Sequence, residues 1–148
     1  MLSLSQRCQY ALRASFELAG RPPGTATSVA EIAAAQAIPP RFLELILKDL
    51  KKAGVVDSRR GPQGGYMLLR SPSEVTVGDI VRLVDGPLRP VKCIAGGGEH
   101  CPLRGGCVFE DLWTATGDAV SGVLDKATLQ HLLDKKQRQS RRPRAMAH

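Results

Sequence analysis

The stretch that decides the fold is residues 39–69, PPRFLELILKDLKKAGVVDSRRGPQGGYMLL. Pro39 and Pro40 can open a helix, because the first helical residue needs no backbone N–H. Gly54 can end that helix, since glycine readily takes the left-handed conformation found at helix C-termini. Two β-prone runs follow, joined by a turn rich in glycine and proline, and they predict a β-hairpin. A helix followed directly by a glycine-rich hairpin is therefore the centre of the predicted fold.

The predicted helix has an apolar face and a charged face. We expect its apolar stripe to comprise Phe42, Leu45, Ile46, Leu50 and Ala53. The charged face comprises Arg41, Glu44, Lys48 and Lys51. Such a face is simply solvated in many amphipathic helices. The paired arginines of the hairpin, Arg59 and Arg60, favour the alternative that both elements meet a polyanion.

Three further helices are predicted around this centre, over residues 9–19, 28–36 and 76–86. Thr27 and Ser28 are candidate caps of the second, and Thr76 with Asp79 resembles a capping box at the start of the third. The residues expected to face the core are Ala11, Ala14, Leu18, Val29, Ile32, Ala33, Val77, Ile80, Val81 and Val84.

Two short helices, a third with a basic face and an arginine-bearing hairpin describe a winged helix-turn-helix, a mainly α fold. In this fold the third helix lies in the major groove, and the hairpin, or wing, reaches the adjacent backbone or minor groove. Glu44 is informative, because phosphate repels a carboxylate whereas a cytosine amino group donates to one. Tyr66 can bond a phosphate or pack the hairpin onto the helices. The residues predicted to bind DNA are Arg41, Glu44, Lys48, Lys51, Arg59, Arg60, Gln63 and Tyr66.

Residues 93–107, CIAGGGEHCPLRGGC, hold three of the chain's four cysteines. Glycine has no side chain to bury and is costly to order, so packing alone does not hold this loop. The chain shows neither a membrane-spanning run nor a signal leader, and we expect it in the cytoplasm, where thiols stay reduced. Cys93, Cys101 and Cys107 are therefore expected to serve metal, cluster or redox chemistry rather than a disulfide.

The spacing of these cysteines favours an iron–sulfur cluster. Seven and five residues separate them, which is wider than a zinc knuckle, and the glycines let the backbone wrap a larger object. Two alternatives stay open. One is a zinc site with His100 as the fourth ligand, and the other is a bare thiol switch near Lys92 and Arg104.

The C-terminal part carries a long apolar stripe and a basic end. From Phe109 to Ala127 apolar residues follow one face of a helix. A monomer of this size has little other structure to bury that face, so we expect a homodimer. Trp113 is assigned to the core or to that dimer interface. The net charge of +7 is concentrated at the end of the chain. The predicted regions are 1–86, the winged helix-turn-helix; 87–107, the cluster loop; 108–134, the dimerisation helix and a C-terminal helix; and 135–148, a basic, disordered tail.

Three segments carry a resemblance to a known family: residues 2–14 (LSLSQRCQYALRA), 39–68 and 75–86 (VTVGDIVRLVDG). They resemble the Rrf-two family of bacterial winged-helix regulators, and the likeness extends over about residues 1–130. Its most specific part is RRGPQGGY, followed at the family's distance by the three cysteines. The resemblance implies a homodimer that binds DNA through the winged helix, with the long helices packed together. It also implies that three thiolates hold a 2Fe–2S or 4Fe–4S cluster whose state sets the affinity for DNA.

The resemblance leaves the fourth ligand open. IscR-type relatives have a histidine three residues after the last cysteine, where this chain has Glu110. NsrR-type relatives use an acidic residue from the partner subunit's first helix, at the position of Gln9. Cys8 lies beside Gln9, and it either supplies a thiolate across the dimer or is a small buried residue. The candidate fourth ligands are therefore Cys8, Glu110 and His100. The cysteine spacing is most similar to that of the RirA subgroup, which implies iron or cluster availability as the signal.

Together these observations predict a transcriptional repressor that binds a palindromic operator. An iron–sulfur cluster would set its affinity in response to iron or cluster availability, or to redox or nitrosative stress. The alternatives are a zinc- or thiol-dependent regulator of the same fold, and an iron–sulfur carrier or scaffold, which would leave the basic helix and wing without a purpose. No Cys-x-x-Cys or nucleophile–base set appears in the sequence, and we expect neither an enzyme nor a membrane partner.

Overall fold

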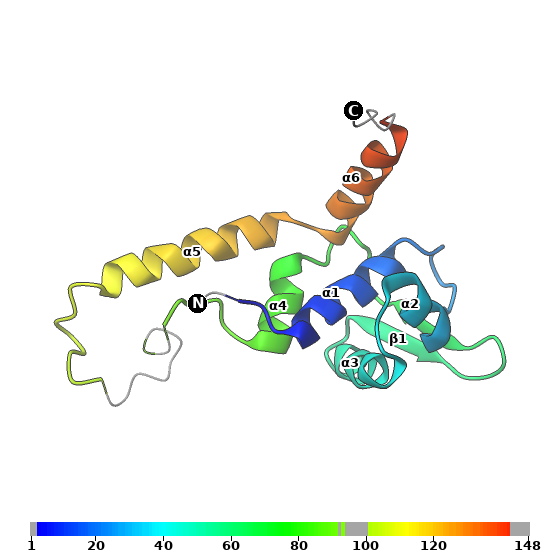
Figure 1. The fold of residues 1–148 in the computed structure, drawn as a ribbon, viewed down its shortest axis with the longest axis horizontal. Helices are drawn as coiled ribbons and strands as arrows, with labels where there is room; N and C mark the ends of the chain where they lie inside the picture. The colour runs from blue at the N-terminus through cyan, green and yellow to red at the C-terminus, as the bar shows by residue number, and fades with distance from the viewer. Residues whose placement is uncertain (1–2, 92, 94–100, 143–148) are drawn as a thin grey trace, which may run out of the picture.

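A computed structural model describes residues 3–91, 93 and 101–142 of the chain. Figure 1 shows a body of short helices and one hairpin, from which a long helix projects. The elements are α1 (Gln6–Ala19), α2 (Val29–Gln36), α3 (Pro40–Lys52), β1 (Val56–Arg59), β2 (Gly65–Leu68), α4 (Val77–Asp85), α5 (Glu110–Lys126) and α6 (Leu129–Arg141). This mainly helical order with a two-stranded wing confirms the predicted winged helix-turn-helix.

Capping side chains fix where the short helices begin. Ser28 accepts from the backbone N–H of Glu31, whose carboxylate accepts in return from the N–H of Ser28, and this capping box starts α2. The predicted box of Thr76 and Asp79 starts α4 in the same way. Thr27 is not a cap. It is buried and exchanges two backbone hydrogen bonds of 2.8 Å with Tyr66, which ties the start of α2 to the wing.

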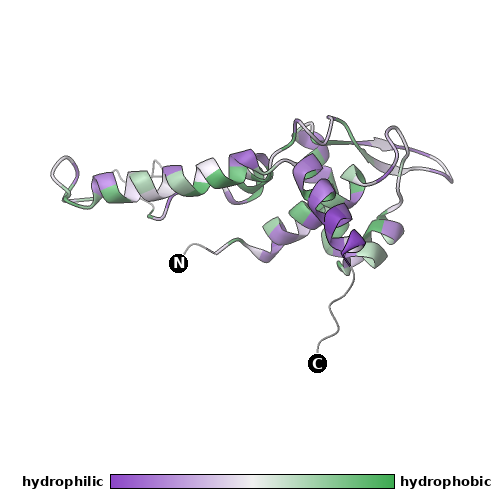
Figure 2. Ribbon diagram, turned by 90° about the horizontal axis from the view of Figure 1, so that it is seen from above, coloured by the Kyte–Doolittle hydropathy of each residue, from purple (hydrophilic) through white to green (hydrophobic). Residues whose placement is uncertain are grey.

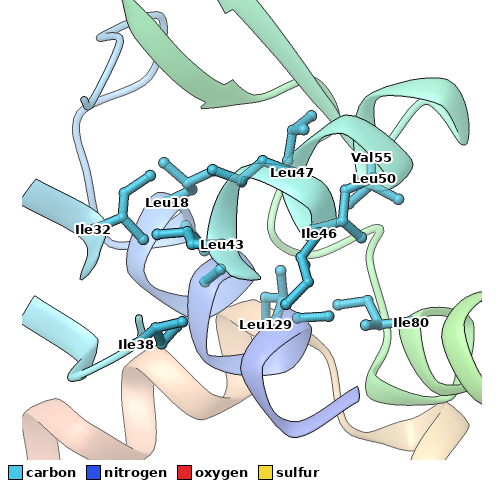
Figure 3. Close-up of a cluster of buried hydrophobic side chains, with 14 of the residues drawn as sticks. Leu18, Ile32, Ile38, Leu43, Ile46, Leu47, Leu50, Val55, Ile80 and Leu129 are labelled. Atoms are coloured by element: carbon cyan, nitrogen blue, oxygen red, sulfur yellow. The ribbon is translucent and has the colours of Figure 1, made fainter. Parts of the chain in front are cut away.

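The core lies among α1, α2, α3, β1, α4 and the start of α6 (Figure 3). The inward residues of α3 are Leu43, Ile46, Leu47 and Leu50, at helical spacing. The predicted stripe on this helix was therefore partly wrong, since Phe42, Leu45 and Ala53 are exposed. Consecutive apolar residues on α3 permit two stripes, and packing against α1 and α2 selects the one that holds Leu43 and Leu47.

The wing is a tight antiparallel hairpin in which Val56 pairs with Leu68 and Arg59 with Gly65. Its glycines are needed for close approach. A Cβ on Gly64 would lie 2.2 Å from the carbonyl oxygen of Arg59, and one on Gly65 would lie 2.1 Å from that of Thr27. The second of these approaches is where the hairpin meets the helices, so the sequence GG fixes both the turn and its docking.

The long helix α5 stands away from the body (Figures 1 and 2), and among its residues only Gly117 is buried. Its C-terminal end is fastened to α4 by the ion pair of Arg82 with Asp125, whose closest N–O distance is 2.6 Å. The next helix, α6, packs on α1 and buries Leu129. This helix continues to Arg141, so the predicted disorder from residue 135 does not hold for residues 135–141. Residues 143–148 of the predicted tail lie outside the described residues.

Candidate functional site

The solvent side of α3 carries the predicted recognition residues. Arg41, Glu44 and Lys48 are all exposed, as the sequence predicts for a DNA-reading face. Lys52 lies on the same side and is exposed as well, although it is not among the residues predicted from the sequence. The sequence spacing could have identified Lys52, because it follows Lys48 by four residues and so falls on the same helix face.

Lys51 has a different environment from the other cations of α3. Its ammonium group donates to the hydroxyl of Ser58 and lies 4.0 Å from the carboxylate of Asp57, both on β1. The side chain therefore bridges α3 and the wing. Lys51 is among the residues that the sequence predicts to bind DNA, and its observed contacts are with β1 of the wing.

The wing presents its polar residues around the turn. Arg59, Arg60 and Gln63 are exposed there. Tyr66 is half-buried and packs against the hydrophobic core, which is the second of the two roles that the sequence left open. Its backbone N–H donates to Thr27 at 2.8 Å. Arg59 at the end of β1, with Arg60 and Gln63 in the turn, thus offers exposed donors on the wing, and Tyr66 fastens the other strand, β2, to Thr27.

The flank of α3 opposite the wing is tied to α1. The guanidinium of Arg7 donates to the carboxylate of Asp49 in a surface ion pair. The start of α1 is tied in turn to the end of α4, because the N–H of Ser5 donates to Asp85 at 2.8 Å. These contacts connect α3, through α1, to α4, which leads into the cysteine loop.

The three loop cysteines line one pocket of about 240 Å³ at the N-terminal end of α5. Cys93 is exposed, Cys101 and Cys107 are half-buried, and all three thiols are free. The other lining residues are Arg104, Glu110, Trp113 and Thr114. Glu110, one of the candidate fourth ligands, thus lines the same pocket as the thiols. Trp113 and Thr114 follow it by three and four residues, so helical periodicity from Glu110 would have found them.

The donor chemistry of this pocket fits an iron–sulfur cluster. Thiolates are the ordinary ligands of such clusters, and the guanidinium of Arg104 can offset their negative charge. Trp113 stacks on Phe109 with ring centroids 5.9 Å apart, which gives the pocket an aromatic wall. Within the described residues, no three His, Cys, Asp or Glu side chains converge closely enough to hold a single metal ion.

The other candidate ligands are placed differently. Cys8 is fully buried in α1 and does not line the cysteine pocket. Burial, followed by the nearby carboxylate of Asp85, raises the pKa of the Cys8 thiol to about 11. This is the environment expected for a small buried residue. Gln9 is exposed, and its side-chain amide donates to the carbonyl of Leu4. His100 and Lys92 lie outside the described residues.

The segment between α4 and Cys93 rests on α5. Arg89 donates to the carboxylate of Asp118 at 2.8 Å. Gly117 leaves room for this contact, since a Cβ there would lie 2.9 Å from the carbonyl oxygen of Leu88. The arrangement fixes the entry to the cysteine loop against the helix that follows it.

A winged helix-turn-helix with exposed cations on its third helix and wing is typical of DNA-binding regulators. The family model named Rrf2, described as "Iron-dependent Transcriptional regulator", matches residues 4–135. The chain belongs to the Rrf2 family, which is the family its sequence resembles, and it is a winged-helix transcriptional regulator. Its relatives are transcriptional regulators, which confirms the prediction that it is not an enzyme.

Individual relatives cover nearly the whole chain. A Rhodobacter capsulatus HTH-type regulator called rrf2-like is 36% identical over 137 residues, 88% of this chain and 91% of that protein. The structure of CymR, the global cysteine regulator of Bacillus subtilis, is 35% identical, with a TM-score of 0.76, and the match covers 91% of this chain and 98% of that chain. The structure of IscR from T. potens is 31% identical, with a TM-score of 0.72, and the match covers 97% of this chain and 94% of that chain.

None of the helices in the described part of the chain has the length and apolar character that a membrane span requires.

Proposed function

We propose that the protein is a homodimeric repressor whose affinity for a palindromic operator is set by an iron–sulfur cluster held on Cys93, Cys101 and Cys107. The observation that carries this proposal is the gathering of the three loop thiols in one pocket with a cation and an aromatic wall. The proposed regions are residues 1–86 for DNA binding, 87–107 for the cluster and 108–134 for dimerisation. The protein would act in the cytoplasm, where its DNA lies.

DNA recognition is assigned to α3 and the wing. Arg41, Glu44 and Lys48 face the bases and phosphates of the major groove, and Arg59 and Arg60 meet the adjacent backbone. Lys51 sets the angle between the two elements through its contacts with β1. One subunit reads one half-site, so a two-fold dimer reads two half-sites separated by whole helical turns.

The cysteine pocket serves as the sensor. When bound, an iron–sulfur cluster supplies a redox-active group that iron shortage, oxidants or nitric oxide can alter. The three cysteines would hold it, with Glu110 the candidate fourth ligand that the structure places in the same pocket. A nuclearity of two or four irons is compatible with this set. We favour iron or cluster availability as the signal, because the spacing of the three cysteines is most similar to that of the RirA subgroup.

A continuous set of contacts leads from this pocket to α3. Arg89, four residues before Cys93, is held by α5 through Asp118. The chain then runs into α4, whose end holds Ser5 at the start of α1. The next contact is the ion pair of Arg7 with Asp49 on α3. A change in the loop can therefore shift the recognition helix, and allosteric coupling of this kind is worth about 1–3 kcal/mol.

A second candidate function is a cluster-free, thiol-dependent regulator. One observation favours it: the global cysteine regulator of B. subtilis shares this fold over nearly its full length. In that case the three free loop thiols would be the sensor themselves, through oxidation or mixed disulfides. A zinc-dependent form of the same regulator is the third arrangement, and metal and sulfide analysis separates all three.

The test is anaerobic purification followed by iron, zinc and acid-labile sulfide analysis. We expect a coloured protein with stoichiometric iron and sulfide, and Cys93→Ala, Cys101→Ala and Cys107→Ala should each abolish the colour. Gel shifts with one operator at one salt concentration should then give different dissociation constants for the cluster-loaded and cluster-free wild type, by about 5- to 150-fold. The cysteine variants should remain fixed in one state.

Several outcomes decide between the candidates. Iron and sulfide retained by the triple alanine variant would exclude the loop as the cluster site. Zinc without sulfide would favour the zinc form, and a metal-free wild type whose DNA affinity responds to oxidants would favour the thiol switch. Equal affinities of the loaded and cluster-free forms would leave a DNA-binding protein whose cluster serves only structure.

A further inference from the structure

Leu45 lies on the solvent side of α3, opposite the core. It follows Leu43 by two residues, and two steps of about 100° each turn its side chain away from the buried face. It is 60% exposed, whereas Leu43 and Leu47 are fully buried. An isolated exposed leucine is ordinary on a protein surface, so its surroundings decide its meaning.

Exposed cations flank Leu45 along α3. Arg41 lies one turn before it, Lys48 one turn after it and Lys52 two turns after it. The one carboxylate at helical spacing from Leu45, that of Asp49, is paired with Arg7. None of the three cations forms an ion pair with another of the described residues. A protein surface that covered Leu45 would have to remove these charges from water without compensation. A polyanion compensates them, so the patch fits nucleic acid better than a second protein surface.

We propose that Leu45 determines sequence specificity by contacting the C5-methyl group of a thymine in the major groove. This inference rests on the proposed function, because α3 must be the helix that faces the bases. The thymine methyl is the apolar group that distinguishes one base edge from the others in the major groove. The flanking cations hold the phosphates on either side, and Leu45 then faces the groove floor between them.

Phe42 supports the same contact from the edge of α3 that faces α1. It is 60% exposed and precedes Leu45 by three residues, so the two side chains are neighbours on the helix. Both line a shallow pocket with Tyr10 of α1. The apolar surface on this face is therefore continuous, with Leu45 at the cationic centre and Phe42 at its margin.

The size of the effect follows from the burial of one methyl group. A buried CH₂ group contributes about 0.8 kcal/mol, which corresponds to about fourfold in affinity for one half-site and about fifteenfold when both half-sites change. The hydrogen bonds of the base pair are unaffected when deoxyuridine replaces thymine, since the two differ only by this methyl.

The test uses the full-length protein and an operator selected by the wild type from a random duplex library. Deoxyuridine then replaces thymine at one symmetric position at a time, and the dissociation constants of the two duplexes are compared on one preparation at one salt concentration. We expect the dissociation constant of the wild type to rise about fifteenfold when deoxyuridine replaces one symmetric pair of thymines. Leu45→Ala should bind both duplexes equally, and Leu45→Met, which keeps an apolar tip, should retain most of the discrimination. Leu69→Ala is the matched control, because Leu69 is 57% exposed and lies outside α3.

The outcomes separate this inference from the function on which it rests. If every deoxyuridine duplex binds the wild type as tightly as the thymine duplex, the methyl contact does not exist. Retained discrimination in Leu45→Ala overturns the assignment to Leu45, and a change only in its monomer–dimer equilibrium places Leu45 in a protein interface. If the wild type selects no operator at all, DNA recognition by α3 fails first and the inference fails with it.

Discussion

Cys8 differs from the loop cysteines in its burial, and this difference can be measured. Its pKa is raised to about 11, first by burial and then by Asp85, so at neutral pH it is a protonated and inaccessible thiol. Because the folded value lies above the usual 9.0, its contribution to stability is complete below pH 9 and is lost as the pH rises through about 11. We expect iodoacetamide to label Cys93, Cys101 and Cys107 of the cluster-free protein and to spare Cys8, as read by peptide mass spectrometry.

Two controls make the Cys8 prediction decisive. All four cysteines should be labelled in denaturant, which shows that protection comes from the fold. Cys8→Ala should keep the visible absorption of the anaerobic protein. Loss of that absorption in a variant that still folds would instead assign Cys8 as the fourth ligand, reached across the dimer.

Glu44 should affect specificity and affinity in opposite ways. Glu44→Ala removes an acceptor for a cytosine amino group and also removes a charge that phosphate repels. General affinity should therefore hold or rise, while discrimination at one base pair in each half-site falls by about 1–3 kcal/mol. Competition gel shifts with single-base operator variants measure both quantities. Glu74→Ala, an exposed carboxylate in the loop before α4, should change neither.

Arginines of the wing supply the contrast to Glu44. Arg59→Ala and Arg60→Ala should weaken binding to all sequences alike, because each removes a cation that pairs with phosphate. Each change should also flatten the log–log salt dependence by up to about one unit for every phosphate that a subunit no longer neutralises. If Glu44→Ala behaved like these two variants, the carboxylate would not be reading a base.

At the scale of an element, α5 depends on the glycine that faces the segment before the cysteine loop. A Cβ on Gly117 would meet the carbonyl oxygen of Leu88 at 2.9 Å and the side chain of Arg89 at 3.0 Å, and a backbone oxygen cannot rotate away. Gly117→Ala should therefore destabilise the protein by about 1–2 kcal/mol in chemical denaturation. Gly122→Ala, where nothing lies within 4 Å of the added atom, should stabilise it by about 0.5–1 kcal/mol. Equal effects at the two sites would contradict the packing of residues 87–91 on α5.

The starts of α2 and α4 and the end of α3 could be predicted from the sequence because local chemistry sets them. The start of α1 was predicted three residues too late, since the cap at Ser5 was not recognised. Ser28 and Thr76 accept from backbone groups three residues ahead, and Gly54 takes a φ of 76° at the end of α3. These interactions involve residues close in the chain, so a short window contains them. The face of α3 that turns inward is set by distant elements instead, and the adjacent apolar pairs Phe42–Leu43 and Leu45–Ile46 gave no local reason to choose between them.

The candidate site shows the same division. The three cysteines and the wing arginines are visible as a pattern of residue types. That Lys51 contacts β1, and that Arg104 lines the same pocket as the thiols, depends on how distant parts of the chain pack and cannot be seen in the sequence. The helix to Arg141 was missed for a related reason, because a run of cations suggests a solvated tail while Leu129 and Leu133 anchor its first turns against the body.

At the scale of the whole molecule, exposed apolar side chains gather on the projecting helix and the loop before it. Of the nine large hydrophobic side chains that are exposed in the described residues, five lie on the cysteine loop and α5: Leu103, Val108, Phe109, Leu112 and Val123. Figures 1 and 2 show this helix projecting from the body, and the segment before Cys93 rests against its middle at Gly117 and Asp118. Removing apolar surface from water stabilises an assembly by about 25 cal/mol for every Å². We therefore expect the α5 helix of a second copy to cover this surface.

Dimerisation through α5 is therefore expected at micromolar concentration, and it should be lost when charge enters this surface. Leu112→Asp and Val123→Asp, at residues 56% and 69% exposed, should leave the fold intact and shift the protein to monomer in sedimentation velocity. Leu69→Asp, at a residue of similar exposure off the helix, should remain dimeric. Under the proposed function one subunit reads one half-site, so the monomeric variants should bind a single half-site as the wild type does and lose the added affinity for the palindrome. A wild-type protein that sediments as a monomer both with and without its cluster would refute the dimer, and with it the palindromic operator.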